Sequence, residues 1–330
     1  MRFSIIIPVY NRPEELEELL ESVMLQEPFT NPEIVVVEDG SDKTGSSVVQ
    51  KYEQTLRIKY CFKKNSGPGD SRNYGMDRAS GDYLILLDSD CILPTDYLSN
   101  IESALEEDYV DAFGGPDRAH ESFTSWQKAI NYSMTSFLTT GGLRNKETPS
   151  KKFQLRSFNM GLSKKAFNLT GGFSKQRIGE DIDLNFKLIQ KGCTTRLIPE
   201  AYVFHKRRTS WLSFFKQTNN FGAARPILNK NHKGSFKISY WFPTLFVIGF
   251  IISCILLYFQ LIIGAMCYLV YTLLVLIDAF AKTKSLVVAF KSVLAVYVQF
   301  FGYGLGYLRT LYRLYIRGMD NRSAFPGMFA

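Results

Sequence analysis

Ser4-Ile5-Ile6-Ile7-Pro8-Val9 and Tyr83-Leu84-Ile85-Leu86-Leu87 are the two apolar runs that decide the fold of this 330-residue chain. Ile34–Val37 and Ile58–Phe62 form two similar runs between them. Continuous runs of aliphatic residues are typical of strands buried on both faces. Segments with helical spacing lie between or after these runs, around 13–24, 43–56, 70–79 and 95–107. Apolar strands that alternate with helices predict an α/β fold with a mostly parallel sheet, covered by helices on both faces.

The charges are unevenly distributed along the chain. It has 39 Lys and Arg against 31 Asp and Glu, a formal net charge of +8. Residues 1–110 carry a net charge of −11 and residues 111–330 carry +19, with the basic excess concentrated in 144–240. Such a segment predicts an anionic partner, such as nucleic acid, a membrane surface or a charged substrate. The 46% hydrophobic content excludes a disordered tail protein, and five cysteines without a Cys-x-x-Cys spacing indicate reduced thiols.

A long apolar region begins near residue 238. Tyr240–Ala281 has Asp278 as its only formally charged residue, which fits a hairpin of two transmembrane helices that turns near Gln260. A buried helical layer in a soluble protein is the alternative. Ser285–Leu308 is a third apolar segment, interrupted by Lys291. The region therefore predicts a multi-pass membrane protein.

The charges around this region predict its orientation. Lysines flank both ends of the hairpin, so the positive-inside rule places these ends in the cytoplasm. Arginines after the third segment favour a re-entrant or interfacial location for it. The apolar stretch Phe3–Val9 is short for a signal peptide, which favours a cytoplasmic N-terminus. Membrane lipids then explain the basic excess, including the basic loop expected at 141–157. No module that reads bases is visible, so we expect no nucleic-acid partner.

Carboxylates follow two of the predicted strands directly. Asp88-Ser89-Asp90 comes after Leu87, and two carboxylates at a strand end can reach one hard divalent cation. Asp39 ends the second strand and can accept a hydrogen bond from a nucleobase N–H. An acidic turn, or an Asx turn at Asp39, is the structural alternative. In parallel sheets, ligands bind beyond the carboxyl ends of the strands.

A glycine-containing loop follows the third strand. Gly67-Pro68-Gly69 precedes a predicted helix that carries Arg72, an arrangement suited to phosphate. The loop lacks the third glycine of the dinucleotide fingerprint, and the chain has no Gly-x-x-x-x-Gly-Lys loop. Asn11 is expected to cap the first helix. The sequence therefore predicts a nucleotide-type site that has neither the dinucleotide-binding loop nor the P-loop of nucleoside triphosphatases.

These motifs occur in one order along the chain. They are Ser4-Ile-Ile-Ile-Pro-Val-Tyr-Asn11, Val-Val-Val-Glu38-Asp39-Gly-Ser, Asn65-x-Gly67 with Ser71-Arg72-Asn73, Leu-Leu-Asp88-Ser-Asp90, Asn159-Met160-Gly161, Gly171-Gly172-Phe173 and Gly179-Glu180-Asp181-Ile182-Asp183-Leu184. Over about residues 4–225 the combination resembles the family 2 glycosyltransferases. The resemblance implies the A-type glycosyltransferase fold, which is Rossmann-like, and transfer of a sugar from a nucleotide sugar with inversion.

The resemblance also implies roles for single residues. Pro8 and Tyr10 would flank the base, Asp39 would bind it, Gly67 and Arg72 would lie near base or phosphate, Asp88 near ribose and metal, and Asp90 would bind Mg²⁺ or Mn²⁺. Where the family commonly has Asp-Asp, this chain has Glu38-Asp39, and we interpret Glu38 as tolerated. In related enzymes a histidine near His205 can touch the metal or diphosphate; an interfacial or core histidine is the alternative.

A carboxylate must also remove the proton from the attacking hydroxyl. The resemblance assigns this role to Asp181, with Glu180 and Asp183 as further candidates. The structural alternative is that these acids only cap the helix expected at 182–191. We expect residues 1–237 to form a cytoplasmic glycosyltransferase domain, with 1–113 for the nucleotide sugar and 114–237 for the acceptor. Residues 238–330 would form the membrane region.

The leading hypothesis is an inverting glycosyltransferase of the inner cell membrane. It would transfer a sugar from a nucleotide-diphosphate sugar, with UDP favoured by resemblance, to a lipid-linked or cell-envelope glycan. A polyprenyl-phosphate glycosyltransferase is second, because an ionised phosphate acceptor needs no base and would leave Gly179–Leu184 without a role. A catalytically silent sugar-nucleotide-binding scaffold is third.

Overall fold

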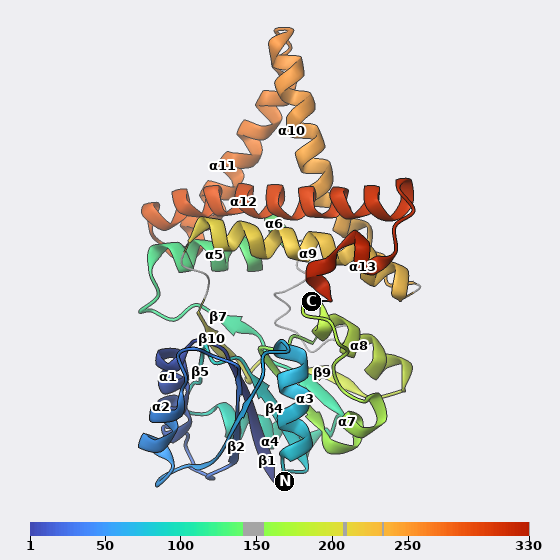
Figure 1. The fold of residues 1–330 in the computed structure, drawn as a ribbon. Helices are drawn as coiled ribbons and strands as arrows, with labels where there is room; N and C mark the ends of the chain where they lie inside the picture. The colour runs from blue at the N-terminus through green and yellow to red at the C-terminus, as the bar shows by residue number, and fades with distance from the viewer. Residues whose placement is uncertain (141–154, 207–209, 233, 330) are drawn as a thin grey trace. The chain divides into compact units, whose positions relative to one another are not determined.

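The computed structural model describes residues 1–140, 155–206, 210–232 and 234–329. Most of the basic loop expected at 141–157 lies outside these residues. The chain forms two compact units (Figure 1). The first comprises Met1–His120 and Lys146–Lys206, and the second comprises Glu121–Asn145 and Arg207–Ala330.

A seven-stranded sheet forms the centre of the first unit, in the order β3-β2-β1-β4-β8-β6-β9. Its strands are β1 (Phe3–Val9), β2 (Glu33–Asp39), β3 (Arg57–Lys63), β4 (Tyr83–Leu87), β6 (Ala112–Gly114), β8 (Asn159–Ser163) and β9 (Thr195–Leu197). Strands β1 to β4 pair in parallel, and β8 runs antiparallel to β4 and β6. Ile5 of β1 lies opposite Ile34 and Ile85 in the two flanking strands. The predicted mostly parallel sheet is confirmed.

Helices cover both faces of this sheet. They are α1 (Pro13–Met24), α2 (Ser46–Tyr52), α3 (Pro68–Arg78), α4 (Tyr97–Glu107), α7 (Lys164–Thr170) and α8 (Glu180–Gln190). Ile5 packs in one hydrophobic cluster with Leu16 of α1, and Ile6 packs in a second cluster with Met76 of α3. Successive strand residues point to opposite faces. The uninterrupted apolar runs are therefore explained by burial on both sides.

The predicted helix cap at Asn11 is wrong. Helix α1 begins after Arg12 and has no side-chain cap. Asn11 has a φ of 54°, and its Oδ1 accepts the backbone N–H of Asp42 and Lys43 at 2.8 and 3.0 Å. Asparagine tolerates this left-handed backbone better than most residues. Asn11 therefore ties the loop after β1 to the loop after β2.

A second, three-stranded sheet lies in the same unit, in the order β5-β10-β7. Its strands are β5 (Cys91–Ile92), β7 (Asp117–Arg118) and β10 (Val203–His205). Strands β5 and β10 are antiparallel, with Cys91 opposite His205. This pairing brings residues more than a hundred positions apart in the chain to the end of β4.

Gly161 of β8 is tightly enclosed. A Cβ there would lie 2.2 Å from Phe113 Cε1 and 2.8 Å from Tyr83 Cε1. Both rings are fully buried, so neither can move into solvent. We expect Gly161→Ala to lower the free energy of unfolding of this unit by about 1–3 kcal/mol, the cost typical of an overpacked core. Hydrogen exchange of β4 and β8 peptides measures it, with the volume-conserving Met160→Leu as control; equal protection in the two variants would contradict the expectation.

The second unit is helical. Its helices are α5 (Ser125–Thr135), α6 (Phe137–Thr140), α9 (Trp211–Asn231), α10 (Phe242–Tyr258), α11 (Ile263–Thr283), α12 (Leu286–Leu311) and α13 (Asn321–Ala324), with short turns η1 (Ile238–Trp241), η2 (Tyr312–Ile316) and η3 (Pro326–Met328). By length and composition, three segments could cross a membrane: Ile238–Tyr258, Ile263–Thr283 and Leu286–Ile316. Gln260 lies between α10 and α11, as expected for the hairpin.

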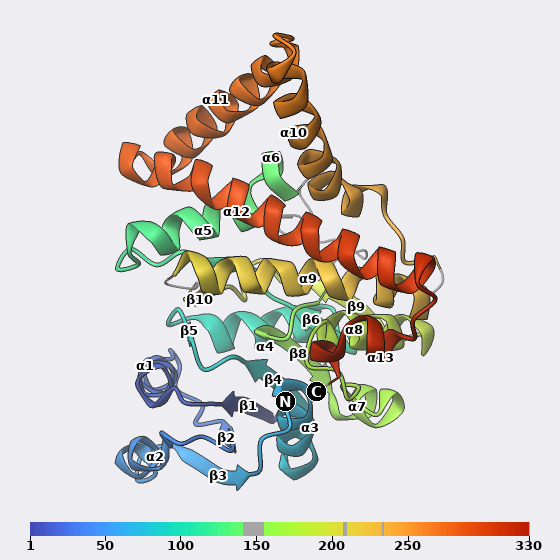
Figure 2. The same ribbon diagram turned by 45° about the horizontal axis from the view of Figure 1, so that its top comes forward.

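Glycines bring α9 and α12 unusually close together. A Cβ at Gly222 would lie 2.0 Å from the Tyr303 carbonyl oxygen, and one at Gly306 would lie 2.2 Å from the Asn219 carbonyl oxygen. Figure 2 shows the two helices side by side, with the α10–α11 hairpin on the other side of α12. The interfacial location of this third segment stays a prediction, as does the functional boundary at residue 237.

Candidate active site

The loops after β2 and β3 meet at Asp39, which is 4% exposed. Its Oδ1 accepts hydrogen bonds from Lys63 Nζ at 2.6 Å and Ser66 N at 2.9 Å, and its Oδ2 accepts the Gly67 N–H at 2.9 Å. Each carboxylate oxygen can accept two bonds, so Oδ2 keeps capacity for a further donor. Asp39 therefore holds the glycine loop while offering an acceptor at the sheet edge.

Gly67 adopts a backbone conformation that favours glycine. Its φ is 97°, and a Cβ there would lie 3.0 Å from Arg177 Cγ. Gly67 is the residue before α3, and α3 carries Arg72.

The residues predicted to flank the base lie at the end of β1. Tyr10, after β1, is 52% exposed, so about half of its surface is accessible to a ligand. Pro8 lies within β1, opposite Val37.

Arg72 joins the end of β4 to the start of α8. Its guanidinium is buried, with Nη2 2.5 Å from Asp88 Oδ1 and Nη1 3.2 Å from Glu180 Oε1. It also lies over the Phe173 ring, 5.4 Å from the centroid. One planar cation thus connects Asp88, predicted for the ribose or metal, with Glu180, one of the three acids predicted for proton transfer. The sequence motifs alone do not indicate this bridge.

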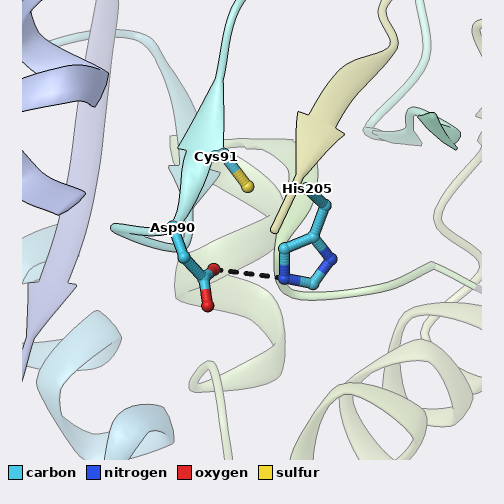
Figure 3. A group of neighbouring side chains, drawn as sticks. All are labelled: Asp90, Cys91 and His205. Atoms are coloured by element: carbon cyan, nitrogen blue, oxygen red, sulfur yellow. Dashed lines mark ion pairs between the residues drawn. The ribbon is translucent and has the colours of Figure 1, made fainter. Parts of the chain in front are cut away.

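Asp90 lies between two basic side chains. Its Oδ2 pairs with Arg12, and its Oδ1 is 3.1 Å from His205 Nε2 (Figure 3). Burial alone would raise the pKa of Asp90, but the nearby His205 and Arg12 hold that pKa well below its usual range. Burial alone would lower the pKa of His205, but Asp90 raises it. His205 also stacks on Phe158, with centroids 4.7 Å apart.

The residues around Asp90 fit a divalent metal. Ligand atoms of Asp90, Cys91 and His205 lie within 4.8 Å of one another. Carboxylate oxygens suit Mg²⁺ and Mn²⁺, imidazole suits divalent transition metals, and a thiol suits softer metals. Cys91 Sγ instead lies 3.5 Å from the Phe158 carbonyl oxygen, to which it donates. Asp88 is not part of this group of three and is bound by Arg72. Asp90 and His205 are the ligands that the arrangement favours, with Asp88 beside them.

The three acids of α8 have different surroundings. The helix begins at Glu180 after Gly179, without a side-chain cap. Burial, followed by the neighbouring Asp181, raises the pKa of Glu180 to about 7. Asp181 lies 3.5 Å from Arg156 Nη1 and accepts the Ile182 N–H at 2.8 Å. Asp183 pairs with Lys187 at 3.0 Å. The N-cap residue is Gly179, so the alternative that one of these acids occupies the N-cap position is wrong. All three acids lie in the first turn of the helix.

Glu38 is more than a tolerated substitution. It is fully buried, and its carboxylate accepts hydrogen bonds from Ser41 Oγ, from Gly45 N at 2.7 Å and from Tyr60 Oη at 3.1 Å. Burial and the Glu38 charge raise the pKa of Tyr60 to about 12. Glu38 therefore holds the loop that follows Asp39. Its longer side chain suits this role.

Two side chains that pair with candidate site residues are not predicted from the sequence. Arg12 pairs with Asp90, and Arg156 lies beside Asp181. Arg12 follows the Tyr10-Asn11 motif directly, and this adjacency was the one available signal. The sequence around Arg156 does not predict its contact with Asp181, because the two residues lie on separate segments of the chain.

Removing the Arg12 charge should strengthen metal binding. We expect Arg12→Gln to raise the Mn²⁺ affinity of the nucleotide-free protein at least about fivefold, since a neighbouring unit charge contributes on the order of 1–4 kcal/mol. Electron paramagnetic resonance of free Mn²⁺ measures this affinity. Lys206→Gln is the matched control, because the Lys206 side chain pairs with Glu18. Unchanged or weaker binding in Arg12→Gln would show that Arg12 does not compete with the metal.

A sequence model described as "Glycosyl transferase family 2" matches residues 4–170. The chain is 30% identical over 237 residues to a chondroitin synthase of Pasteurella multocida, covering 62% of this chain and 24% of that protein. It is 36% identical over 116 residues to GalNAc(5)-diNAcBac-PP-undecaprenol beta-1,3-glucosyltransferase of Campylobacter jejuni, covering 34% of this chain and 37% of that protein. The chain thus spans well under half the length of these relatives.

Solved structures align with nearly the whole chain at low sequence identity. The mannosyltransferase PcManGT of Pyrobaculum calidifontis, in complex with GDP-Man and Mn²⁺, aligns with a TM-score of 0.56 and 16% identity, covering 93% of this chain and 87% of that one. TarS 1–349 of S. aureus, in complex with UDP-GlcNAc, aligns with a TM-score of 0.50 and 18% identity, covering 97% of this chain and 93% of that one. At such identity the likeness concerns the fold.

Proposed function

Because the chain belongs to glycosyltransferase family 2 and has the A-type glycosyltransferase fold, we propose that it is a membrane-bound inverting enzyme. It transfers a sugar from a nucleotide-diphosphate sugar to a hydroxyl of a lipid-linked or cell-envelope glycan. The observation that carries the proposal is the Arg72 bridge. It joins Asp88, on the donor side, to Glu180, at the start of the segment with the proposed base. A site that both binds the donor and activates an acceptor needs both groups together.

The reaction forms one bond and breaks another. The acceptor oxygen attacks the anomeric carbon, the bond from that carbon to the diphosphate oxygen breaks, and the hydroxyl proton passes to a carboxylate. We assign this last role to Asp181, with Glu180 and Asp183 as further candidates. A positioned base of this kind typically contributes 10²- to 10⁴-fold to the rate. Arg156 Nη1 lies 3.5 Å from Asp181 Oδ2 and would help to orient this carboxylate.

Donor binding is assigned to the loops at the sheet edge. Tyr10 and Pro8 would flank the base, Asp39 would accept its N–H, and Gly67 would let the backbone approach the ligand. A divalent metal, Mg²⁺ or Mn²⁺, held by Asp90 with His205 and Asp88, would neutralise the diphosphate as it leaves. The family resemblance favours UDP.

The second unit supports a membrane location, because three of its segments are long and apolar enough to cross a bilayer. The lysines that flank the first two segments support, by the positive-inside rule, our proposal that the catalytic unit lies on the cytoplasmic side of the inner membrane. The similarity to a Campylobacter jejuni enzyme named for an undecaprenol-linked glycan supports an acceptor attached to a lipid.

Nucleotide release tests the proposal. The purified full chain is incubated with UDP-, GDP- and dTDP-sugars and Mn²⁺ or Mg²⁺, with a polyprenyl-diphosphate-linked sugar, with polyprenyl phosphate, or with neither. Release that needs the sugar-bearing acceptor is the expected result. Release with polyprenyl phosphate instead would favour the second hypothesis. No release from any donor with either metal would favour the silent scaffold.

A further inference from the structure

A buried arginine of the second unit forms no ion pair with any carboxylate among the described residues. Arg225, in α9, is 7% exposed, and its Nε and Nη1 have no hydrogen-bond partner among the described residues. Its guanidinium carbon lies 4.1 Å from the centroid of the Tyr240 ring. A ring face attracts a cation but leaves these N–H donors without acceptor oxygens. The side chain is therefore held in place yet unsatisfied.

The second unit cannot supply the missing anion from its own acids. It contains 16 Lys and Arg against only three acids, Glu121, Asp278 and Asp320, a net charge of +13. Asp278 accepts hydrogen bonds from Tyr132, Ser136 and Lys282. Asp320 caps α13. Glu121 is exposed at the beginning of the unit.

The neighbours of Arg225 indicate the kind of anion. Tyr240 and Trp241 lie at the beginning of the first apolar segment, Ile238–Tyr258, and Trp241 packs against Tyr307 with ring centroids 5.3 Å apart. Trp and Tyr are enriched at the level of lipid head groups in membrane proteins. A phosphate is the anion present at that level, and the arginine fork matches its oxygens.

We propose that Arg225 binds a phosphate group of a membrane lipid. The bound phosphate would accept hydrogen bonds from the guanidinium, and the Tyr240 ring would hold the guanidinium plane. Two kinds of lipid carry the required group: a glycerophospholipid and a polyprenyl diphosphate. The proposal rests on the membrane location in the proposed function, but not on sugar transfer.

Two variants of α9 separate this role from a structural one. Arg225→Met keeps an apolar stem of similar length and removes the charge, whereas Lys230→Met removes an equal charge from an exposed position of the same helix. Each full-length protein is purified in maltoside micelles, which contain no phosphate. Undecaprenyl diphosphate, phosphatidylglycerol or undecaprenol is then added, and native mass spectrometry and the thermal unfolding midpoint are recorded.

We expect at least one phosphate-bearing lipid to bind the wild-type chain and raise its midpoint. Arg225→Met should bind that lipid at least about tenfold more weakly, as expected for lost hydrogen bonds to a charged group, and Lys230→Met should bind it within about twofold of wild type. The lipid that binds Arg225→Met more weakly than it binds the wild-type chain is identified as the source of the phosphate. Without lipid, Arg225→Met should melt no lower than wild type, because an uncompensated buried charge costs stability.

Three results would overturn the proposal. They are equal lipid affinity in Arg225→Met and wild type, equal stabilisation by undecaprenol, and a lower midpoint of Arg225→Met in lipid-free micelles without any selective loss of binding. No donor sugar is present in this experiment. A chain inactive in nucleotide release can therefore still satisfy the proposal, and an active chain can fail it.

Discussion

Asp181→Asn should reduce sugar transfer by about 10³-fold or more while donor binding stays within about threefold of wild type. The amide keeps the size of the side chain and its bond to the Ile182 N–H, but it cannot take the proton of the attacking hydroxyl. Asp39, Tyr10 and the Arg72 bridge are untouched by this change. Nucleotide release at saturating donor and acceptor measures the first effect, and calorimetric titration with the nucleotide measures the second.

Asp183→Asn is the matched control for the proposed base. Asp183 lies two residues further along α8 and pairs with Lys187, so its loss should cost less than about tenfold. Glu180→Gln tests the remaining candidate. The pKa of Glu180 is about 7, so this carboxyl is largely protonated below neutral pH, a state in which it cannot accept a proton. Near-normal turnover in Asp181→Asn, with loss in either of the other two variants, would move the role to that residue.

Arg72→Met should lower the free energy of unfolding of the first unit by about 3–5 kcal/mol, the range found when one partner of a buried ion pair is removed. Arg72 is 2% exposed and contacts both Asp88 and Glu180. Arg72→Lys should restore little of the lost free energy of unfolding, because a single ammonium lacks the planar fork that reaches two carboxylates. Arg78→Met is the control, since Arg78 is exposed on the same helix. Equal losses in the two methionine variants would contradict the bridge.

The loss in Arg72→Met should also grow with pH. The Arg72 charge lowers the pKa of Glu180, and burial and Asp181 still hold that pKa at about 7, above the ordinary 4.5. Without Arg72 this pKa rises further. Above pH 7 the unfolded chain then binds fewer protons than the folded chain, so stability falls as pH rises. The difference between variant and wild type should be larger at pH 8.5 than at pH 6.

Hydrogen exchange of peptides from β1 and β4 is the suitable measurement for these stabilities. The chain has three tryptophans, Trp126, Trp211 and Trp241, and all lie in the second unit. Tryptophan fluorescence therefore reports on the helical unit, whereas exchange of strand peptides reports on the unit that contains Arg72.

Much of the fold was predictable because it depends on consecutive residues. The run Ser4–Val9 is apolar without alternation, and the structure buries it on both faces. The placement of Asp39, Asp88 and Asp90 was predictable because Asp39 ends a buried strand, Asp88 and Asp90 follow another, and parallel strands end at one edge of the sheet. The apolar segments after residue 238 were found by their length. Periodicity, strand ends and apolar length are local properties, so the sequence by itself determined them.

Other features depend on residues that meet only after folding. His205 reaches Asp90 because β10 pairs with β5, Arg12 reaches the same carboxylate from the start of α1, and Arg225 lies over Tyr240. Asn11 fits a helix-cap pattern but instead binds the loop after β2. The energy of a side-chain contact falls steeply with distance and depends on burial, and both quantities are defined by the tertiary structure. The sequence thus determined the family, the sheet and its strand-end carboxylates. The tertiary structure decided which charges those carboxylates face, and it left Arg225 without a carboxylate partner among the described residues.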